Sequence, residues 1–108
     1  MTEGRKYDSG KPRVSLLPVG PLLEVCRVLT YGAEKYTLRD ASGNVTSDGA
    51  NNWQLVSGGS ARYLDAAGRH LLAYIGGETH DAETGLHHLA HLACCAMFVL
   101  WHEQNGGR

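Results

Sequence analysis

The fold is decided by residues 60–104, SARYLDAAGRHLLAYIGGETHDAETGLHHLAHLACCAMFVLWHEQ. A helix is predicted over residues 60–75, because Ser60 is a good N-cap and the double glycine Gly76-Gly77 would end it. Apolar residues recur along it at helical spacing and form one stripe: Leu64, Ala67, Leu71 and Ile75. A further helix is expected to begin at Glu78 or Asp81 and to run to Gln104. The tight glycine junction would make these two helices an antiparallel hairpin.

The rest of the chain predicts one more helix, an arm and a long loop. The helix follows Pro18 and Pro21 and runs to about Tyr36, with apolar residues at Leu22, Val25, Cys26 and Leu29. Residues 1–17 contain breakers and form an irregular arm, whereas residues 37–60 contain four glycines and form a long loop. The sequence therefore predicts an all-α fold, a small helical bundle in which residues 1–108 make one domain.

Composition narrows the class of protein. Ten Lys and Arg stand against 11 Asp and Glu, and this net charge of −1 disfavours a nucleic-acid binder that works by phosphate neutralisation. Cys26, Cys94 and Cys95 lie in apolar stretches without a CxxC pair, which predicts buried thiols in a reducing compartment.

The N-terminus is polar, and no apolar run is long enough to span a membrane. We expect a cytoplasmic protein without a membrane partner, and a chain this short would gain core by oligomerising.

Acids and histidines gather just after the double glycine. On a helix that begins by Glu78, five residues would share one face within about 140°: Glu78, Asp81, Gly85, His88 and His91. Carboxylate oxygens suit Mg²⁺ or Mn²⁺, and imidazoles could bind Mn²⁺ or hold the carboxylates in place. The helix dipole alone also favours acids in a first turn, so a purely structural role stays open.

Cationic and aromatic residues elsewhere would suit a nucleotide. Basic side chains bind phosphate and aromatic rings stack on a base, and the candidates for substrate binding are Lys11, Lys35, Tyr36, Asn52, Trp53, Arg62, Arg69 and His70. An exposed Arg69–Asp65 pair beside a packed histidine is the alternative for that part of the second helix. The dipeptide His80-Asp81 leaves an HD-type phosphohydrolase as a minor alternative.

Several short motifs, in this order and spacing, resemble one phage-associated family. They are Lys6-Tyr7-Asp8-x-Gly10-Lys11-Pro12-Arg13, Leu16-Leu17-Pro18, Tyr31-Gly32-Ala33-x-Lys35-Tyr36, Asn52-Trp53, Arg62-Tyr63, Arg69-His70-Leu71 and Gly77-Glu78-x-x-Asp81-x-Glu83-x-Gly85-x-x-His88-Leu89-x-His91. Over residues 5 to 100 the chain resembles the dATP/dGTP diphosphohydrolases, a MazZ-like family placed among the MazG-like all-α NTP pyrophosphohydrolases.

The resemblance implies a MazG-like helical bundle, homo-oligomers (a dimer or tetramer), Mg²⁺ or Mn²⁺, and release of pyrophosphate from dGTP or dATP. In phages whose DNA contains 2-aminoadenine, the dGMP product would feed synthesis of the modified nucleotide. The broader MazG pattern pairs an ExxE motif with an ExxD motif. Here Glu78 and Asp81 supply an ExxD, but the second helix has no ExxE. Glu24 and Glu34 of the first helix, or His88 and His91, are therefore the candidates to complete the metal site.

The sequence hypothesis is metal-assisted attack of water on the α-phosphorus of a purine deoxynucleoside triphosphate. The predicted metal ligands are Glu78, Asp81, Glu83, Glu24, Glu34 and His91, and the predicted catalytic residues are Glu78, Asp81 and His88. One carboxylate or His88 would act as general base. A non-catalytic module that binds nucleotide or metal, and a purely structural helical oligomer, remain as competing hypotheses.

Overall fold

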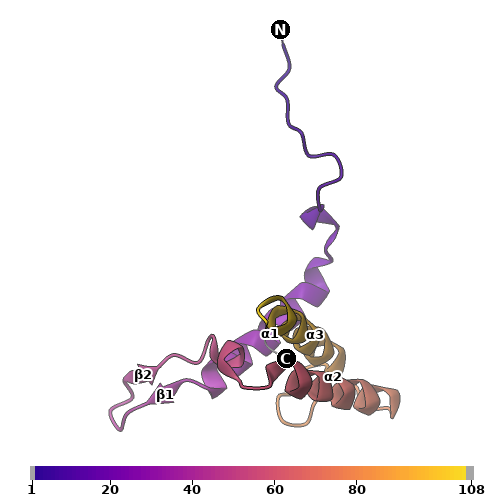
Figure 1. Cartoon of the computed structure of the whole chain (residues 1–108). Coiled ribbons are helices and arrows are strands. Elements are labelled where there is room, and N and C mark those ends of the chain that lie inside the picture. Colours follow the sequence, from indigo (N-terminus) through magenta and orange to yellow (C-terminus); the bar gives the residue numbers. More distant parts are fainter. Residues whose placement is uncertain (1, 107–108) are drawn as a thin grey trace.

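A computed structural model describes residues 2–106 and confirms a mainly helical fold with three long helices (Figure 1). The helices are α1 (Val19–Lys35), α2 (Gly59–Ile75) and α3 (His88–Gln104). Two 3-10 turns, η1 (Val14–Leu16) and η2 (Asn52–Leu55), and two short strands, β1 (Leu38–Arg39) and β2 (Val45–Ser47), complete the elements. The N-terminal arm projects away from the helices, as Figure 1 shows.

Helices α2 and α3 form the predicted antiparallel hairpin, and α1 packs on α3. The buried apolar side chains are small and few: Val25, Ala67, Ala90, Cys94 and Cys95. Burial raises the pKa of Cys94 to about 12 and that of Cys95 to about 11, so both thiols stay protonated at neutral pH. Buried thiols were expected, and this is confirmed for Cys94 and Cys95 but wrong for Cys26, which is exposed.

The start of α3 differs from the sequence prediction. The helix begins at His88 rather than at Glu78 or Asp81, and the ring of His87 caps it by accepting a hydrogen bond from the Leu89 N–H. Residues 76–87 form a compact loop instead, closed by an antiparallel bridge between His80 and His87. The prediction failed because the loop's side chains bond its own backbone: Asp81 Oδ2 accepts from the Thr84 and Glu83 N–H groups, and such bonds compete with a helix.

The segment between α1 and α2 is more ordered than an irregular loop. Strands β1 and β2 pair as an antiparallel hairpin, whose turn is held by Asp40 Oδ1 and by Gly43 at φ 86. The hairpin's two ends meet at α1, where Thr37 Oγ1 accepts from the Gly49 N–H and donates to the Ala33 carbonyl. Gly49 lies so close to this last turn of α1 that a Cβ there would overlap backbone atoms.

Two predictions for α2 are corrected. The helix is capped at Gly58, with φ 64, rather than at Ser60, whose hydroxyl donates to Glu103 on α3. Of the apolar stripe, Ala67 is buried, but Leu64, Leu71 and Ile75 are 61%, 40% and 69% exposed, so this chain alone does not cover it. Among residues 2–106, no helix is both long and apolar enough to cross a membrane.

Candidate functional site

A cavity of about 620 Å³ lies among the three helices, with η2 on one side and the loop residues 81–84 on another. It contains acids, histidines and basic side chains together, and one of its walls is apolar. Three segments far apart in sequence supply its acidic and basic side chains: the end of α1, the middle of α2, and the loop that leads into α3. The hairpin of α2 and α3 brings these elements together, which explains why sequence periodicity alone could not place them on one surface.

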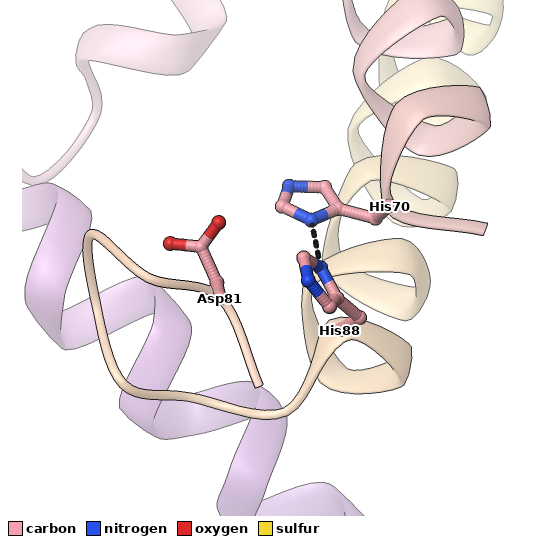
Figure 2. Close-up of side chains that lie close together, drawn as sticks. All are labelled: His70, Asp81 and His88. Carbon is pink, nitrogen blue, oxygen red and sulfur yellow. Dashed lines mark hydrogen bonds between the residues drawn. The ribbon is translucent and has the colours of Figure 1, made fainter. Parts of the chain in front are cut away.

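One cluster at this cavity has the geometry of a metal site. Donor atoms of His70, Asp81 and His88 all lie within 4.8 Å of one another. Figure 2 shows His70 on α2 and His88 at the start of α3 with their rings in contact, while Asp81 reaches toward them from the loop. The two Nδ1 atoms are 2.8 Å apart. Two imidazoles and one carboxylate are ligands that Mn²⁺, Fe²⁺ and Zn²⁺ accept in proteins.

Glu78 contacts this cluster through His88. Its Oε1 atom lies 2.8 Å from His88 Nε2, and His88 is 3% exposed. Both ring nitrogens of His88 are thus engaged, one by Glu78 and one by His70. His88 does not line the cavity itself, and its role as general base stays a prediction. Glu78 is placed to orient His88 rather than to bind an ion itself.

His91, which was predicted to bind metal, lies beside His70 on the cavity wall. The two rings stack with centroids 4.5 Å apart and an interplanar angle of 8°, and His91 Nε2 lies 2.7 Å from Thr84 Oγ1. Burial lowers the pKa of both histidines, and the two neighbouring imidazoles lower that of His70 further. Both rings are therefore neutral at neutral pH, which leaves lone pairs for hydrogen bonds or for a metal.

Asp81 is ionised over a wide pH range. Partial burial by itself raises the pKa of Asp81, but hydrogen bonds from the Thr84 backbone and side chain outweigh it, and the pKa lies below its usual value. Asp81 also fixes the loop, because its Oδ2 accepts from two backbone N–H groups. A carboxylate held in this way can offer its other oxygen to a cation without reorganising.

Three basic residues predicted to bind substrate share the cavity: Lys35, Arg62 and Arg69. Lys35 Nζ lies 2.7 Å from Glu83 Oε1, and this hydrogen bond raises the pKa of Lys35. Glu83 lies on the cavity wall and pairs with Lys35 instead of joining the cluster. The site therefore combines a fixed carboxylate with several cations, as a bound metal and a polyphosphate would require.

Both aromatic residues predicted to bind substrate, Tyr36 and Trp53, line the cavity, and they differ in how much of each ring is already covered. Trp53 stacks on Phe98 with ring centroids 4.1 Å apart and meets Trp101 edge-on, so one face of its indole is already covered. Its backbone carbonyl also accepts a hydrogen bond from His102 Nε2. Tyr36, which is 49% exposed and lines the cavity, is the freer ring for stacking on a base. Asn52 lines the cavity as well.

Three predicted site residues lie away from both the cluster and the cavity. Glu24 pairs with Arg27 and lines a separate cavity, while Glu34 pairs with Arg39 on the surface. Lys11 lies on the projecting arm. Metal binding by Glu24 or Glu34 was predicted only because helix α2 lacks an ExxE motif, and the structure offers His70 in their place. The HD dipeptide is also split, since His80 lines the separate cavity while Asp81 lines this one.

Sequence reasoning placed His70 in the site, as a substrate-binding residue, but did not pair it with His88, which lies 18 positions away on another helix. Thr84, which contacts both Asp81 and His91, was not singled out. The spacing of Asp81 and Thr84 is that of a side-chain turn, and that signal could have revealed a loop.

Comparison with known proteins agrees with the motifs. A family model described as "dATP/dGTP diphosphohydrolase, N-terminal" matches residues 1–108. A "dATP/dGTP diphosphohydrolase" of Salmonella phage PMBT28 is 41% identical over 98 residues, which cover 91% of this chain and 29% of the relative. The chain thus spans less than a third of that relative's length, and no solved structure matches it. The chain belongs to the dATP/dGTP diphosphohydrolase N-terminal family.

Proposed function

We propose that this protein hydrolyses a purine deoxynucleoside triphosphate, dGTP or dATP, to the monophosphate and pyrophosphate with the help of Mg²⁺ or Mn²⁺. The observation that carries this proposal is that Asp81 and His70 face the same cavity as Lys35, Arg62 and Arg69. The name of the phage relative supports the substrate class. In a phage that makes 2-aminoadenine, the product dGMP would be a precursor of the modified nucleotide.

The proposed reaction is an in-line displacement at the α-phosphorus. A bond forms from water oxygen to that phosphorus, the bond to the α,β-bridging oxygen breaks, and pyrophosphate leaves with the electron pair. A divalent ion held near Asp81 would neutralise charge on the phosphate oxygens and acidify the water. Arg62 and Arg69 bind the phosphates, and Tyr36 stacks on the base. Glu83, the other carboxylate on the cavity wall, accepts the proton from water.

The test is a screen of the common NTPs and dNTPs with product identification. With Mg²⁺ or Mn²⁺ present, we expect pyrophosphate and the monophosphate from dGTP or dATP, and no turnover in excess EDTA. Release of inorganic phosphate instead would identify a different bond. Stoichiometric nucleotide binding without product, at any metal tested, would overturn the proposal in favour of a sequestering module.

We also propose that the protein acts as a homo-oligomer whose copies meet along α3. Apart from its histidines, α3 carries one charged residue, Glu103, and helices that are apolar all round are normally buried on every side. Yet Leu89, Met97 and Leu100, which share one face, are 39%, 46% and 57% exposed. A second copy offers the same uncharged face, and such self-complementary contacts are typical of two-fold dimers.

Sedimentation equilibrium checks this assembly. We expect the mass of a dimer or tetramer, and a shift to the monomer mass when Met97→Glu and Leu100→Glu are combined, because both charges would be buried between copies. The control is Leu55→Glu, since Leu55 is exposed on η2, away from this face. A wild-type protein that stays monomeric while folded would contradict the assembly.

A further inference from the structure

We propose that the ion is held by His70 Nδ1, His88 Nδ1 and Asp81, a mixed nitrogen and oxygen site that selects Mn²⁺ and related transition metals over Mg²⁺. This inference rests on the proposed function for its purpose, but its test requires no turnover. It departs from the sequence prediction, in which carboxylates supplied most of the ligands. It also moves His70 from substrate binding to metal binding.

The separation of the two imidazoles fits a shared ion. Two nitrogens bound at about 2.1 Å and about 90° apart on one ion would lie about 3.0 Å from each other. The observed distance between the Nδ1 atoms of His70 and His88 is 2.8 Å, so both nitrogens could reach one ion beside the pair once the two rings turn their lone pairs from each other toward it. The Asp81 carboxylate completes a face of three donors within 4.8 Å, and the open cavity beyond leaves room for water or phosphate.

The hydrogen bond between Glu78 and His88 favours one tautomer of His88. Glu78 Oε1 lies 2.8 Å from Nε2, and a proton on Nε2 donates to the carboxylate. In that tautomer the lone pair is on Nδ1, which faces His70. This carboxylate–histidine arrangement is the usual support of a metal-binding imidazole. His88 is 3% exposed, so packing and the bond to Glu78 keep its ring close to the place where the ion would bind.

His70 completes the pair by a change of tautomer. Without an ion, its Nδ1–H donates to the lone pair of His88 Nδ1, which accounts for the contact between the two rings. When an ion binds, the proton moves through solvent to Nε2 of His70, and Nδ1 offers its lone pair. No net proton is released by His70 in this change of tautomer.

The donor set determines the preference among metals. Mg²⁺ binds oxygen almost exclusively and retains several waters, whereas imidazole nitrogen binds Mn²⁺ and, increasingly, Co²⁺. Two of the three donors here are nitrogens. The other carboxylates predicted to bind metal all have partners of their own: Glu24 and Glu34 pair with arginines, Glu83 pairs with Lys35, and Glu78 contacts His88. The expected order of affinity is therefore Mg²⁺, then Mn²⁺, then Co²⁺ as the tightest of the three.

Metal binding to the EDTA-stripped protein, without nucleotide, tests the assignment. Calorimetry should give one Mn²⁺ per chain, bound at least about tenfold more tightly than Mg²⁺. Electron spin-echo modulation of bound Mn²⁺ should show coupling to ¹⁴N of directly bound imidazole. A site made of carboxylates and water would show no such coupling, and that result would overturn the proposal.

Variants locate the ligands. Glu78→Gln keeps the hydrogen bond geometry but removes the charge behind His88, and we expect Mn²⁺ affinity to fall about ten- to a hundredfold. His70→Asn should weaken binding and reduce the ¹⁴N coupling. The matched controls are His80→Gln and Glu24→Gln, on residues that line the separate cavity, and both should bind Mn²⁺ as the wild type does. Thermal unfolding of each metal-free variant identifies any that fail to fold. The Glu78 side chain is 55% exposed, so a substitution there is less disruptive to the fold than one at His70.

The outcomes for metal and for catalysis are separable. Nitrogen-ligated Mn²⁺ in a protein that hydrolyses no dNTP supports this site and overturns the proposed function. Hydrolysis that is equally fast with Mg²⁺, together with Mn²⁺ that shows no ¹⁴N coupling, overturns this site and leaves the function standing. Equal affinity in wild type, Glu78→Gln and His70→Asn also overturns it.

Discussion

Pyrophosphate release from dGTP or dATP is expected to fall at least about 100-fold in Asp81→Asn, since about 1.4 kcal/mol of lost transition-state stabilisation is tenfold in rate and a held metal ion supplies several kcal/mol. Asparagine retains an oxygen that can accept the two loop N–H bonds made by Asp81 Oδ2. The loop should therefore keep its shape while the charge that faces the cation is lost. Initial rates at saturating metal measure the effect.

The control for this variant is Asp65→Asn. Asp65 is an exposed carboxylate on the same molecule, on α2, and it does not line the cavity. We expect its rate to stay within about twofold of wild type, because surface substitutions of this kind rarely disturb a site. If Asp81→Asn retained the wild-type rate, or if Asp65→Asn lost it equally, the proposed location of the reaction would be wrong.

A large loss of stability is expected in Gly59→Ala. A Cβ at Gly59 would lie 2.3 Å from His102 Nε2, and His102 is buried and bonded to the Trp53 carbonyl. The ring cannot withdraw without breaking that bond and disturbing its contact with Trp53, so the methyl group overpacks the junction. The free energy of unfolding should fall by about 1–3 kcal/mol. Chemical denaturation followed by circular dichroism measures it.

Gly32→Ala provides the opposite result as a control. Gly32 lies in α1 with nothing within 4 Å of its ideal Cβ. Alanine favours a helix over glycine by about 1 kcal/mol in an interior position, so this variant should be as stable as wild type or more so. Equal stability of Gly59→Ala and wild type would mean that the contact between α2 and His102 is looser than described.

The sequence predicted the long helices because they depend on local periodicity and on strong breakers. Proline before α1 and glycine after α2 mark their ends to within a residue or two. The predicted start of α3 lies at least seven residues before the observed start at His88. Acids are common in the first turn of a helix, but they are also common in loops. There the bonds from Asp81 to the Thr84 backbone outweighed helix propensity.

The sequence predicted part of the candidate site, but on a helical face that the structure does not have. Asp81 and His88 were expected together on one helical face, and they do lie together, but because the loop folds back onto the start of α3. The contribution of His70 depends on how α2 and α3 are aligned, and sequence periodicity does not determine that alignment. Similarly, Trp53 was predicted to bind a ligand because it stands in a loop; it does line the cavity, but its stacking on Phe98 of α3 could not be read from the sequence.

The attachment of Thr37 and Gly49 to α1 determines how the hairpin between them can vary among relatives. Both ends of the β1–β2 hairpin are held at one place, by Thr37 and by the close approach of Gly49, while its tip lies free of the helices (Figure 1). Adding residues at such a tip costs little, because closure entropy rises slowly with length. Evolution can thus lengthen or reshape this appendage, for instance to contact another protein, without altering the geometry around Asp81.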